Sequence, residues 1–282
     1  LAARLIGQAG VPQKRIRIID PGPKLLHSWY RCSQNTGMRF LRSPSVHHLD
    51  VEPFSLRLFA EQAFGQSGEV PFTPPFDRPS VKLFSAHCDH VISRFQLDSI
   101  HVQDQVMDVT LHCDGVHIAL KGQEQMRAKQ VILAMGMSSH PKWPSWSSAL
   151  VMAGITIHHI FGPDFALVPE RWPQRVAVIG AGLSGTQAAI RLAASGRTVH
   201  LVSRHAIREH QFDSDPGWVG PKYMRGYLAQ KNVVARREMI QNARHIGSIP
   251  QDIHRELQRC IQNGTIAWHQ GEVSAMPVDD GA

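Results

Sequence analysis

The sequence predicts an α/β protein in which parallel strand–helix–strand units are combined with an antiparallel meander. Three segments of the 282-residue chain carry this prediction. Residues 175–205 read as a strand, a glycine-rich turn, a helix and a second strand, and residues 1–20 read as a helix followed by a strand that ends in Asp20. Residues 101–134 alternate between apolar and polar side chains and are interrupted by Asp114-Gly115 and Gly122, which is typical of a meander.

The first segment contains only the second half of a strand–helix–strand unit. Apolar spacing predicts a helix over residues 1–10 that ends at Gly7 or Gly10, and the apolar run at residues 15–20 predicts a buried strand. The first strand and glycine loop of such a unit would precede this helix, so we expect the chain to be a fragment that lacks them. Residues 276–282 end in a turn with no strand after it, which gives the same expectation for the other end.

The segments between these units are predicted from composition and spacing. Residues 24–50, rich in serine, proline and histidine, are expected to be irregular, and the third strand of the meander is expected to end at Ala134-Met135-Gly136. The remaining expected elements are helices at 54–65, 80–94, about 221–230 and 251–262, a polar loop at 206–221, and a strand at 266–269.

Composition excludes several classes of protein. Hydrophobic residues make up 43% of the chain and charged residues 19%, which is typical of globular domains, and no apolar run approaches the length of a membrane-spanning helix. The four cysteines form no C-x-x-C pair, so we expect no dithiol redox centre, no zinc ribbon and a reduced compartment such as the cytoplasm. No metal site is expected, and His87 and His90 are predicted to lie on a helix surface.

The basic character of the chain suits an anionic partner. The net charge is +7, with 30 lysines and arginines against 23 aspartates and glutamates. Because no nucleic-acid-binding motif is present, a small phosphate-bearing ligand explains this charge better than nucleic acid. We therefore expect small-molecule ligands and neither nucleic acid nor a membrane as partner.

The glycine-rich turn is the most specific motif in the chain. Gly180, Gly182 and Gly185 follow a strand and open a helix, in the G-x-G-x-x-G spacing of dinucleotide-binding proteins. The first glycine turns the chain tightly, the second lets the backbone approach a pyrophosphate, and the third packs the helix against the strand. The backbone N–H groups at the helix start, with Leu183 and Ser184 between the glycines, would face the phosphates.

The end of the second strand indicates which dinucleotide is bound. An NAD site usually carries an acidic residue here, whereas this chain has Ser203 and Arg204, with Arg208 close by in sequence. A guanidinium binds the 2′-phosphate of NADP through paired hydrogen bonds, and an acidic side chain would repel it. The sequence therefore predicts NADPH rather than NADH.

The order of these features resembles that of the flavoproteins with two dinucleotide-binding domains. In that group an Ala-Thr-Gly motif closes the FAD domain before the NAD(P)H domain, and Ala134-Met135-Gly136 is similar, with methionine for threonine. The turn that starts at Gly180 is similar to the G-x-G-x-S-G version of class B flavoprotein monooxygenases, which include flavin-containing, N-hydroxylating and Baeyer–Villiger enzymes. The resemblance implies an incomplete FAD-binding domain over residues 1–170, an inserted NADPH-binding domain over 171–275, and a return to the FAD domain from 276 to 282.

The resemblance also implies cofactors and a reaction. FAD would bind near Asp20, Ala134, Met135 and Gly136, and NADPH would reduce it. Reduced flavin would then add oxygen to give a C4a-(hydro)peroxide that oxidises an amine or another soft nucleophile. The cofactor carries this chemistry, so no catalytic side chain is needed and none is predicted. Because the first glycine loop is expected to be missing, we expect this fragment by itself to hold FAD poorly and to be inactive.

Two other functions stay open. One is an NAD(P)H-flavin reductase that passes electrons to an acceptor other than oxygen, and the other is a non-catalytic dinucleotide sensor. Gly154 and His158 keep the spacing of a signature that precedes the second fingerprint in these monooxygenases, but Met152 replaces its phenylalanine. This favours an N-hydroxylating type or an uncharacterised relative over a Baeyer–Villiger or drug-oxidising type.

Overall fold

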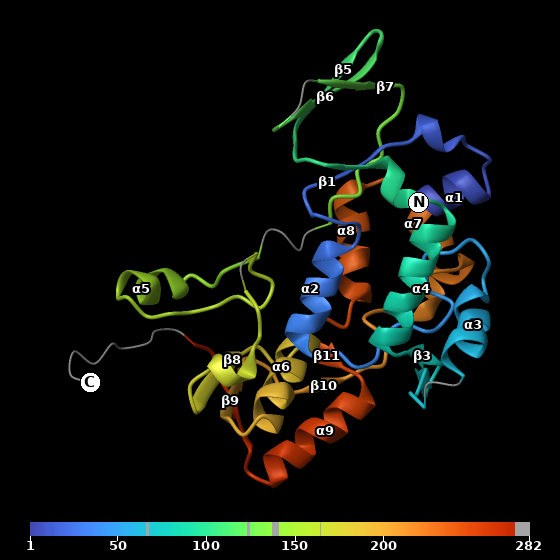
Figure 1. Ribbon diagram of the computed structural model, residues 1–282. Helices are drawn as coiled ribbons and strands as arrows, with labels where there is room; N and C mark the ends of the chain where they lie inside the picture. Colours follow the sequence, from blue (N-terminus) through green and yellow to red (C-terminus); the bar gives the residue numbers. More distant parts are fainter. Residues whose placement is uncertain (66–67, 123–124, 137–140, 164, 274–282) are drawn as a thin grey trace. The chain divides into compact units, whose positions relative to one another are not determined.

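Figure 1 shows a computed structural model of the chain. The chain divides into two compact units. The structure describes residues 1–65, 68–122, 125–136, 141–163 and 165–273. The first unit comprises Leu1–Ser33 and Arg39–His140, and the second comprises Gln34–Met38 and Pro141–Ala282. The expected return to an FAD domain at 276–282 lies outside the described residues.

The first unit is built from short strands and helices. Its helices are α1 (Ala2–Gly7), α2 (His27–Thr36, whose last turn lies in the second unit), α3 (Ser55–Phe59), which continues as the π-helix η2 (Ala60–Phe64), and α4 (Val81–Arg94), with the 3-10 turns η1 (Gln13–Arg15) and η3 (Leu97–Ile100). Its strands are β1 (Ile18–Asp20), β2 (Phe72–Thr73), β3 (Arg78–Pro79), β4 (His101–Gln103), β5 (Val106–His112), β6 (Gly115–Leu120) and β7 (Met126–Ala128). Strands β1 and β4 pair in parallel, so Asp20 lies opposite Gln103 at the end of the pair.

The meander of the first unit is confirmed for β5, β6 and β7, which pair in antiparallel order (Figure 1). Every second residue of β6, namely Val116, Ile118 and Leu120, points into a small core that Ile19 and Val131 also contact. The expected final strand is wrong in its position, because β7 ends at Ala128 and residues 131–136 form no strand. A strand needs a hydrogen-bonded neighbour, and no strand of the described residues pairs with this segment.

The second unit contains a three-stranded parallel sheet in the order β12-β9-β8. The strands of the unit are β8 (Arg175–Ile179), β9 (Thr198–Ser203), β10 (Arg208–Glu209), β11 (Ser248–Ile249) and β12 (Ile266–Gln270), of which β10 and β11 pair separately from the sheet. Its helices are α5 (Ser147–Met152), α6 (Leu183–Ala194), α7 (Pro221–Ala229), α8 (Val233–Ala243) and α9 (Gln251–Gln262), with the 3-10 turns η4 (Pro169–Arg171) and η5 (Pro216–Trp218). Helix α6 connects β8 to β9 and α9 leads into β12, which is the parallel crossover arrangement expected for a dinucleotide-binding fold.

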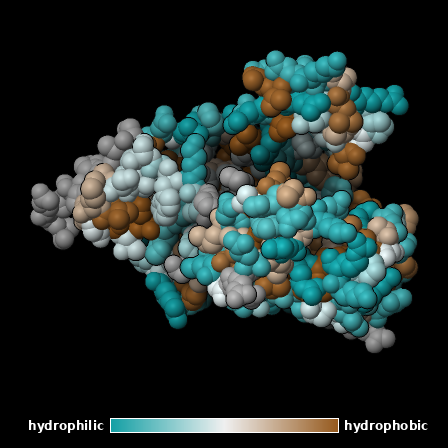
Figure 2. Space-filling model, turned by 90° about the horizontal axis from the view of Figure 1, so that it is seen from above, coloured by the Kyte–Doolittle hydropathy of each residue, from teal (hydrophilic) through white to brown (hydrophobic). Residues whose placement is uncertain are grey.

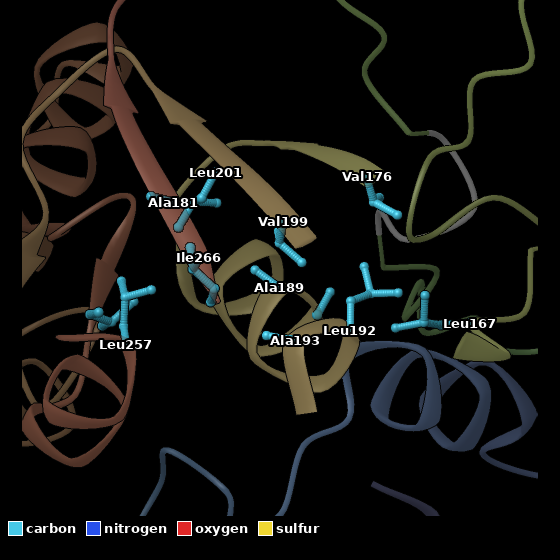
Figure 3. Close-up of a cluster of buried hydrophobic side chains, with 12 residues drawn as sticks. Leu167, Val176, Ala181, Ala189, Leu192, Ala193, Val199, Leu201, Leu257 and Ile266 are labelled. Carbon is cyan, nitrogen blue, oxygen red and sulfur yellow. The ribbon is translucent and has the colours of Figure 1, made fainter. Parts of the chain in front are cut away.

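The core of the second unit lies between this sheet and the two helices (Figure 3). Ala189, Leu192 and Ala193 of α6 pack toward Val199 and Leu201 of β9, and each of these five residues is buried. Val176, Ile266 and Leu257 extend the cluster to β8, β12 and α9. Small alanines on α6 let the helix lie close to the strands, so the start of α6 is held firmly at the end of β8.

Three helices, α2, α5 and α8, were not predicted from the sequence. Helix α2 falls in a stretch expected to be irregular, because it is mostly polar and has few apolar residues to reveal a helical spacing. Its end is fixed instead by Asn35, whose Nδ2 donates to the carbonyl oxygens of Ile160 and Phe165 at 3.2 and 2.8 Å. Helix α8 begins after Asn232, whose Oδ1 accepts from the N–H groups of residues 234 and 235, and this cap was a readable signal.

The surface agrees with the charged composition. The face shown in Figure 2 is mostly hydrophilic, with hydrophobic residues scattered between polar ones. Within the described ranges, none of the helices combines the length and apolar character needed to cross a membrane. All four cysteines are free thiols.

Candidate dinucleotide-binding site

The glycine-rich turn has the geometry that the sequence predicts. Gly180 has a φ of +105°, in the region that side chains rarely adopt, and its N–H donates to the carbonyl oxygen of Val202 at 2.7 Å. A Cβ placed on Gly185 would lie 2.0 Å from the carbonyl oxygen of Gly180, so only glycine fits there. These two positions bring the start of α6 into direct contact with the end of β8.

The start of α6 presents its backbone N–H groups without a side-chain cap. Gly182 occupies the N-cap position in an extended conformation, and no side chain among the described residues caps this helix. The N–H groups of Leu183, Ser184 and Gly185 precede the first intrahelical donor, Thr186, which donates to Gly182 at 2.9 Å. Together with the helix dipole, these groups provide a site for an anionic phosphate.

A segment far along the chain lies beside this turn. A Cβ placed on Gly182 would lie 3.5 Å from the Cα of Gly247, which has a φ of +76° and immediately precedes β11. Sequence reasoning missed Gly247, because nothing in the sequence around it links it to the fingerprint. Because Gly247 has no side chain, none fills the space beside Gly182 from this direction.

The residues predicted to select NADPH lie at and after the end of β9. Ser203 closes the strand, and its hydroxyl accepts from Trp268 Nε1 at 3.0 Å and donates to the carbonyl oxygen of His205 at 2.9 Å. Ser203 therefore supports the turn with its own side chain. Arg208 lies on the exposed strand β10 and pairs with Ser248, so its position is set by a different strand.

Arg204 is exposed and has an acidic neighbour. Its Nη1 lies 3.8 Å from Oε1 of Glu272, and the side chains are 68% and 72% exposed. Glu272 follows β12, the strand next to β9, so adjacency in the sheet explains the contact. A pair this exposed is weak, which leaves the guanidinium able to bind another anion.

The residues predicted to bind FAD lie in the first unit. Asp20 ends β1, and its Oδ1 accepts from the N–H of Gly22 at 2.8 Å. Its other carboxylate oxygen has no hydrogen bond to the described residues and is available to a ligand hydroxyl. Ala134, Met135 and Gly136 are exposed, and Gly136 has a φ of +64°. Ile19 and Val131, close to Asp20 and Ala134 in the chain, contact the same small core of the meander.

A buried polar cluster in the first unit was also not predicted. His87 was expected on a helix surface, but it is fully buried on α4, with Nε2 2.9 Å from the hydroxyl of Ser55. That hydroxyl donates to Asp50 at 2.5 Å, and Asp50 also accepts from Arg94 at 2.9 Å. The expectation was wrong because α4 packs against the segment that contains Asp50 and Ser55, and the helix sequence alone does not show this.

Burial and hydrogen bonds set the charges in this cluster. Burial is the main reason that the pKa of His87 is lowered to about 4; the neighbouring His48 also lowers it, and the carboxylate of Asp50 acts in the opposite direction. Burial alone would raise the pKa of Asp50, but hydrogen bonds from Ser55 and the Val51 N–H, with the charge of Arg94, hold that pKa below its ordinary value. Ser55 therefore donates to a carboxylate and is not an activated nucleophile, so the cluster holds two segments together.

Comparison with known proteins identifies the family. A profile described as pyridine nucleotide-disulphide oxidoreductase matches residues 8–252. The chain belongs to this family. Compared by sequence with curated proteins, it has no significant match.

Solved structures with a similar fold include enzymes of two kinds. L-lysine 6-monooxygenase from Pseudomonas syringae is 16% identical, with a TM-score of 0.63 over 99% of this chain and 70% of that one. Ornithine N-hydroxylase from Kutzneria sp. 744, solved with reduced FAD, NADP+ and L-ornithine, is 14% identical, with a TM-score of 0.64 over 94% of this chain and 67% of that one. Bacillithiol disulfide reductase from Staphylococcus aureus is 16% identical, with a TM-score of 0.58 over 98% of this chain and 64% of that one.

These findings confirm the resemblance inferred from the sequence. The family establishes an oxidoreductase that depends on flavin and pyridine nucleotide, and the similar structures share its α/β fold. At such low identities the structures show the fold, and they do not transfer a substrate to this chain.

Proposed function

We propose that this family member binds NADPH in the second unit and FAD in the first, and acts as a monooxygenase on an amine or another soft nucleophile. The observation that supports the nucleotide site is the turn from Gly180 to Gly185, where the missing side chains of these two glycines and the uncapped start of α6 leave backbone N–H groups able to bind a phosphate. The pyrophosphate would be held by these groups, and Arg204 would bind the 2′-phosphate.

The FAD site is supported by Asp20 and by the segment at Ala134–Gly136. An acidic residue at the end of a parallel strand accepts hydrogen bonds from ribose hydroxyls, and one oxygen of Asp20 is already fixed by Gly22, which orients the other. Bound FAD would supply the redox chemistry. The task of the chain is then to position both cofactors and to limit the access of water.

An amine substrate is supported by the similar structures of lysine and ornithine hydroxylases. A small-molecule substrate also agrees with the absence of any nucleic-acid motif in the sequence. We place the protein in the cytoplasm, because its four cysteines are free and widely spaced in the sequence.

A reductase is the second candidate, because a disulfide reductase shares this fold with a TM-score of 0.58. The chain has no C-x-x-C pair, so a dithiol mechanism within it is disfavoured, whereas quinone or ferredoxin acceptors remain compatible. A non-catalytic sensor has no comparable support, because the family is one of oxidoreductases.

Coenzyme titration tests the nucleotide site, and turnover tests the reaction. We expect NADPH to bind at least tenfold more tightly than NADH, and Arg204→Gln to remove this preference; equal affinities would contradict the role of Arg204. With FAD and NADPH in air, the full-length protein should convert lysine or ornithine into a hydroxylated amine. Turnover only after addition of a quinone would instead establish the reductase.

A further inference from the structure

The tip of the β5–β6 hairpin brings two histidines together on one face. His112 pairs with Gly115 and His117 pairs with Thr110, so the two histidines are diagonal neighbours on the same side of the two strands. Their ring centroids lie 4.0 Å apart with 22° between the ring planes. The turn between the strands is only two residues long, and this keeps the pair in register.

Asp114 in that turn completes a group of three possible metal ligands. Its Oδ1 lies 3.1 Å from Nε2 of His117, and one ligand atom from each of His112, Asp114 and His117 lies within 4.8 Å of the other two. Bonds from Zn²⁺ to imidazole nitrogen and carboxylate oxygen are about 2.0–2.2 Å long, which places the ligand atoms of a tetrahedral ion roughly 3.4 Å apart. The distance between Asp114 Oδ1 and His117 Nε2 is already close to that spacing, and rotation of the exposed His112 ring would bring its nitrogen to a similar distance from both.

We propose that His112, Asp114 and His117 bind a divalent transition-metal ion such as Zn²⁺ at the tip of this hairpin. Two imidazoles and one carboxylate suit zinc better than the hard cations Mg²⁺ and Ca²⁺, which prefer oxygen ligands alone. Three protein ligands leave the fourth position of the ion to water. The site shares no residue with the proposed nucleotide sites.

The exposure of the ligands favours metal binding, whereas a neighbouring positive charge opposes it. The side chains of His112 and Asp114 are exposed, so a metal ion need not be brought into a dry interior. Arg127 lies 3.4 Å from Oδ2 of Asp114, and its positive charge opposes the ion. Removal of this charge should therefore strengthen binding, which an ordinary surface histidine pair would not predict.

This site was not predicted from the sequence, which led us to expect no metal. The H-x-D-x-x-H spacing is not a metal motif by itself, and only the pairing of β5 with β6 places the three side chains together. In the described part of the chain, no other set of three histidine, cysteine or acidic side chains meets the same spacing.

A second histidine pair provides a matched control. His200 on β9 and His269 on β12 are also diagonal neighbours, with Nδ1 and Nε2 3.0 Å apart, but they belong to no such group of three. Cys113, the exposed thiol in the hairpin turn, is the nearest alternative ligand and needs its own control.

Zinc titration of the tag-free chain, by calorimetry and by competition with a chromogenic chelator, tests the proposal. We expect one ion per chain to be lost, or its Kd raised at least tenfold, in His112→Ala and His117→Ala. His200→Ala and Cys113→Ser should bind like the unchanged chain, and Arg127→Gln should bind several-fold more tightly. Circular dichroism should show that each variant is folded.

Cobalt gives a second readout, because a tetrahedral Co²⁺ site has visible absorption bands that a loosely held hexahydrate lacks. These bands should be present for the unchanged chain and absent for His112→Ala. The proposal is overturned if His112→Ala binds as tightly as the unchanged chain, or if His200→Ala loses as much affinity, since the uptake would then come from scattered histidines.

Discussion

Two glycines of the same turn should differ when each is replaced by alanine: we expect Gly185→Ala to lower the stability of the fold and Gly182→Ala to weaken NADPH binding. At Gly185 the new Cβ would lie 2.0 Å from the carbonyl oxygen of Gly180, and contacts below 3.0 Å do not occur at real Cβ atoms. The start of α6 would have to move away from β8 by about 1 Å or more. Because α6 carries much of the core of the second unit, we expect Gly185→Ala to lower the free energy of unfolding by about 3 kcal/mol.

At Gly182 the new Cβ would meet only backbone atoms of Gly247, the nearest being its Cα at 3.5 Å, which is an ordinary contact. The backbone of Gly182 is extended, with φ −75° and ψ 175°, which alanine adopts without strain. We therefore expect Gly182→Ala to change stability by less than about 0.5 kcal/mol. The methyl group would nevertheless occupy the space that a pyrophosphate needs, so NADPH binding should weaken at least tenfold.

Two assays separate these effects. Urea unfolding followed by tryptophan fluorescence measures stability, because Trp172 and Trp268 pack against the core of the second unit. Fluorescence titration with NADPH measures binding. The reasoning is refuted if Gly185→Ala is as stable as the unchanged chain, or if Gly182→Ala is unfolded to the same degree as Gly185→Ala.

Three further predictions concern residues outside the turn. Glu272→Gln removes the carboxylate beside Arg204, and because the pair is exposed we expect a gain in NADPH affinity of about fivefold at most, with NADH affinity unchanged in the same titration. Asn35→Ala should lower the free energy of unfolding in urea by about 2–3 kcal/mol, since it leaves two partly buried carbonyl groups and the buried N–H of Leu167 unpaired. Gln34→Ala, at an exposed position, should have little effect. The pKa of His87 is about 4 in the folded chain and near 6.5 in the unfolded chain, so the unfolded state takes up a proton first as the pH falls. Lowering the pH from 7 to 4 should therefore lower the free energy of unfolding by about 3 kcal/mol. A His87→Asn variant should lose that part of the pH dependence in acid-to-neutral unfolding curves, and an identical dependence in the variant would contradict the assignment.

The second unit was predictable because its turn and its first helix depend on residues that are close together in the sequence. The turn at Gly180 and Gly185 has steric conditions that consecutive residues must satisfy, and the apolar spacing of α6 records which face is buried. The cap at Asn232 belongs to the same kind of signal, although it was not recognised. Elements without such signals were misjudged: α2 is held by the contacts of Asn35, and residues 131–136 are apolar but lack a neighbouring strand among the described residues.

The amino-acid sequence by itself determined the α/β class, the glycine turn, the oxidoreductase family and the basic residue after β9, because each is encoded in residues close together along the chain. The tertiary structure alone decided that Gly247 lies beside Gly182, that Glu272 lies beside Arg204, and that His87 is buried against Ser55. Each of these contacts joins residues separated by tens of positions. Their energies depend on how strands and helices pack, and packing is a property of the folded chain rather than of any short stretch of its sequence.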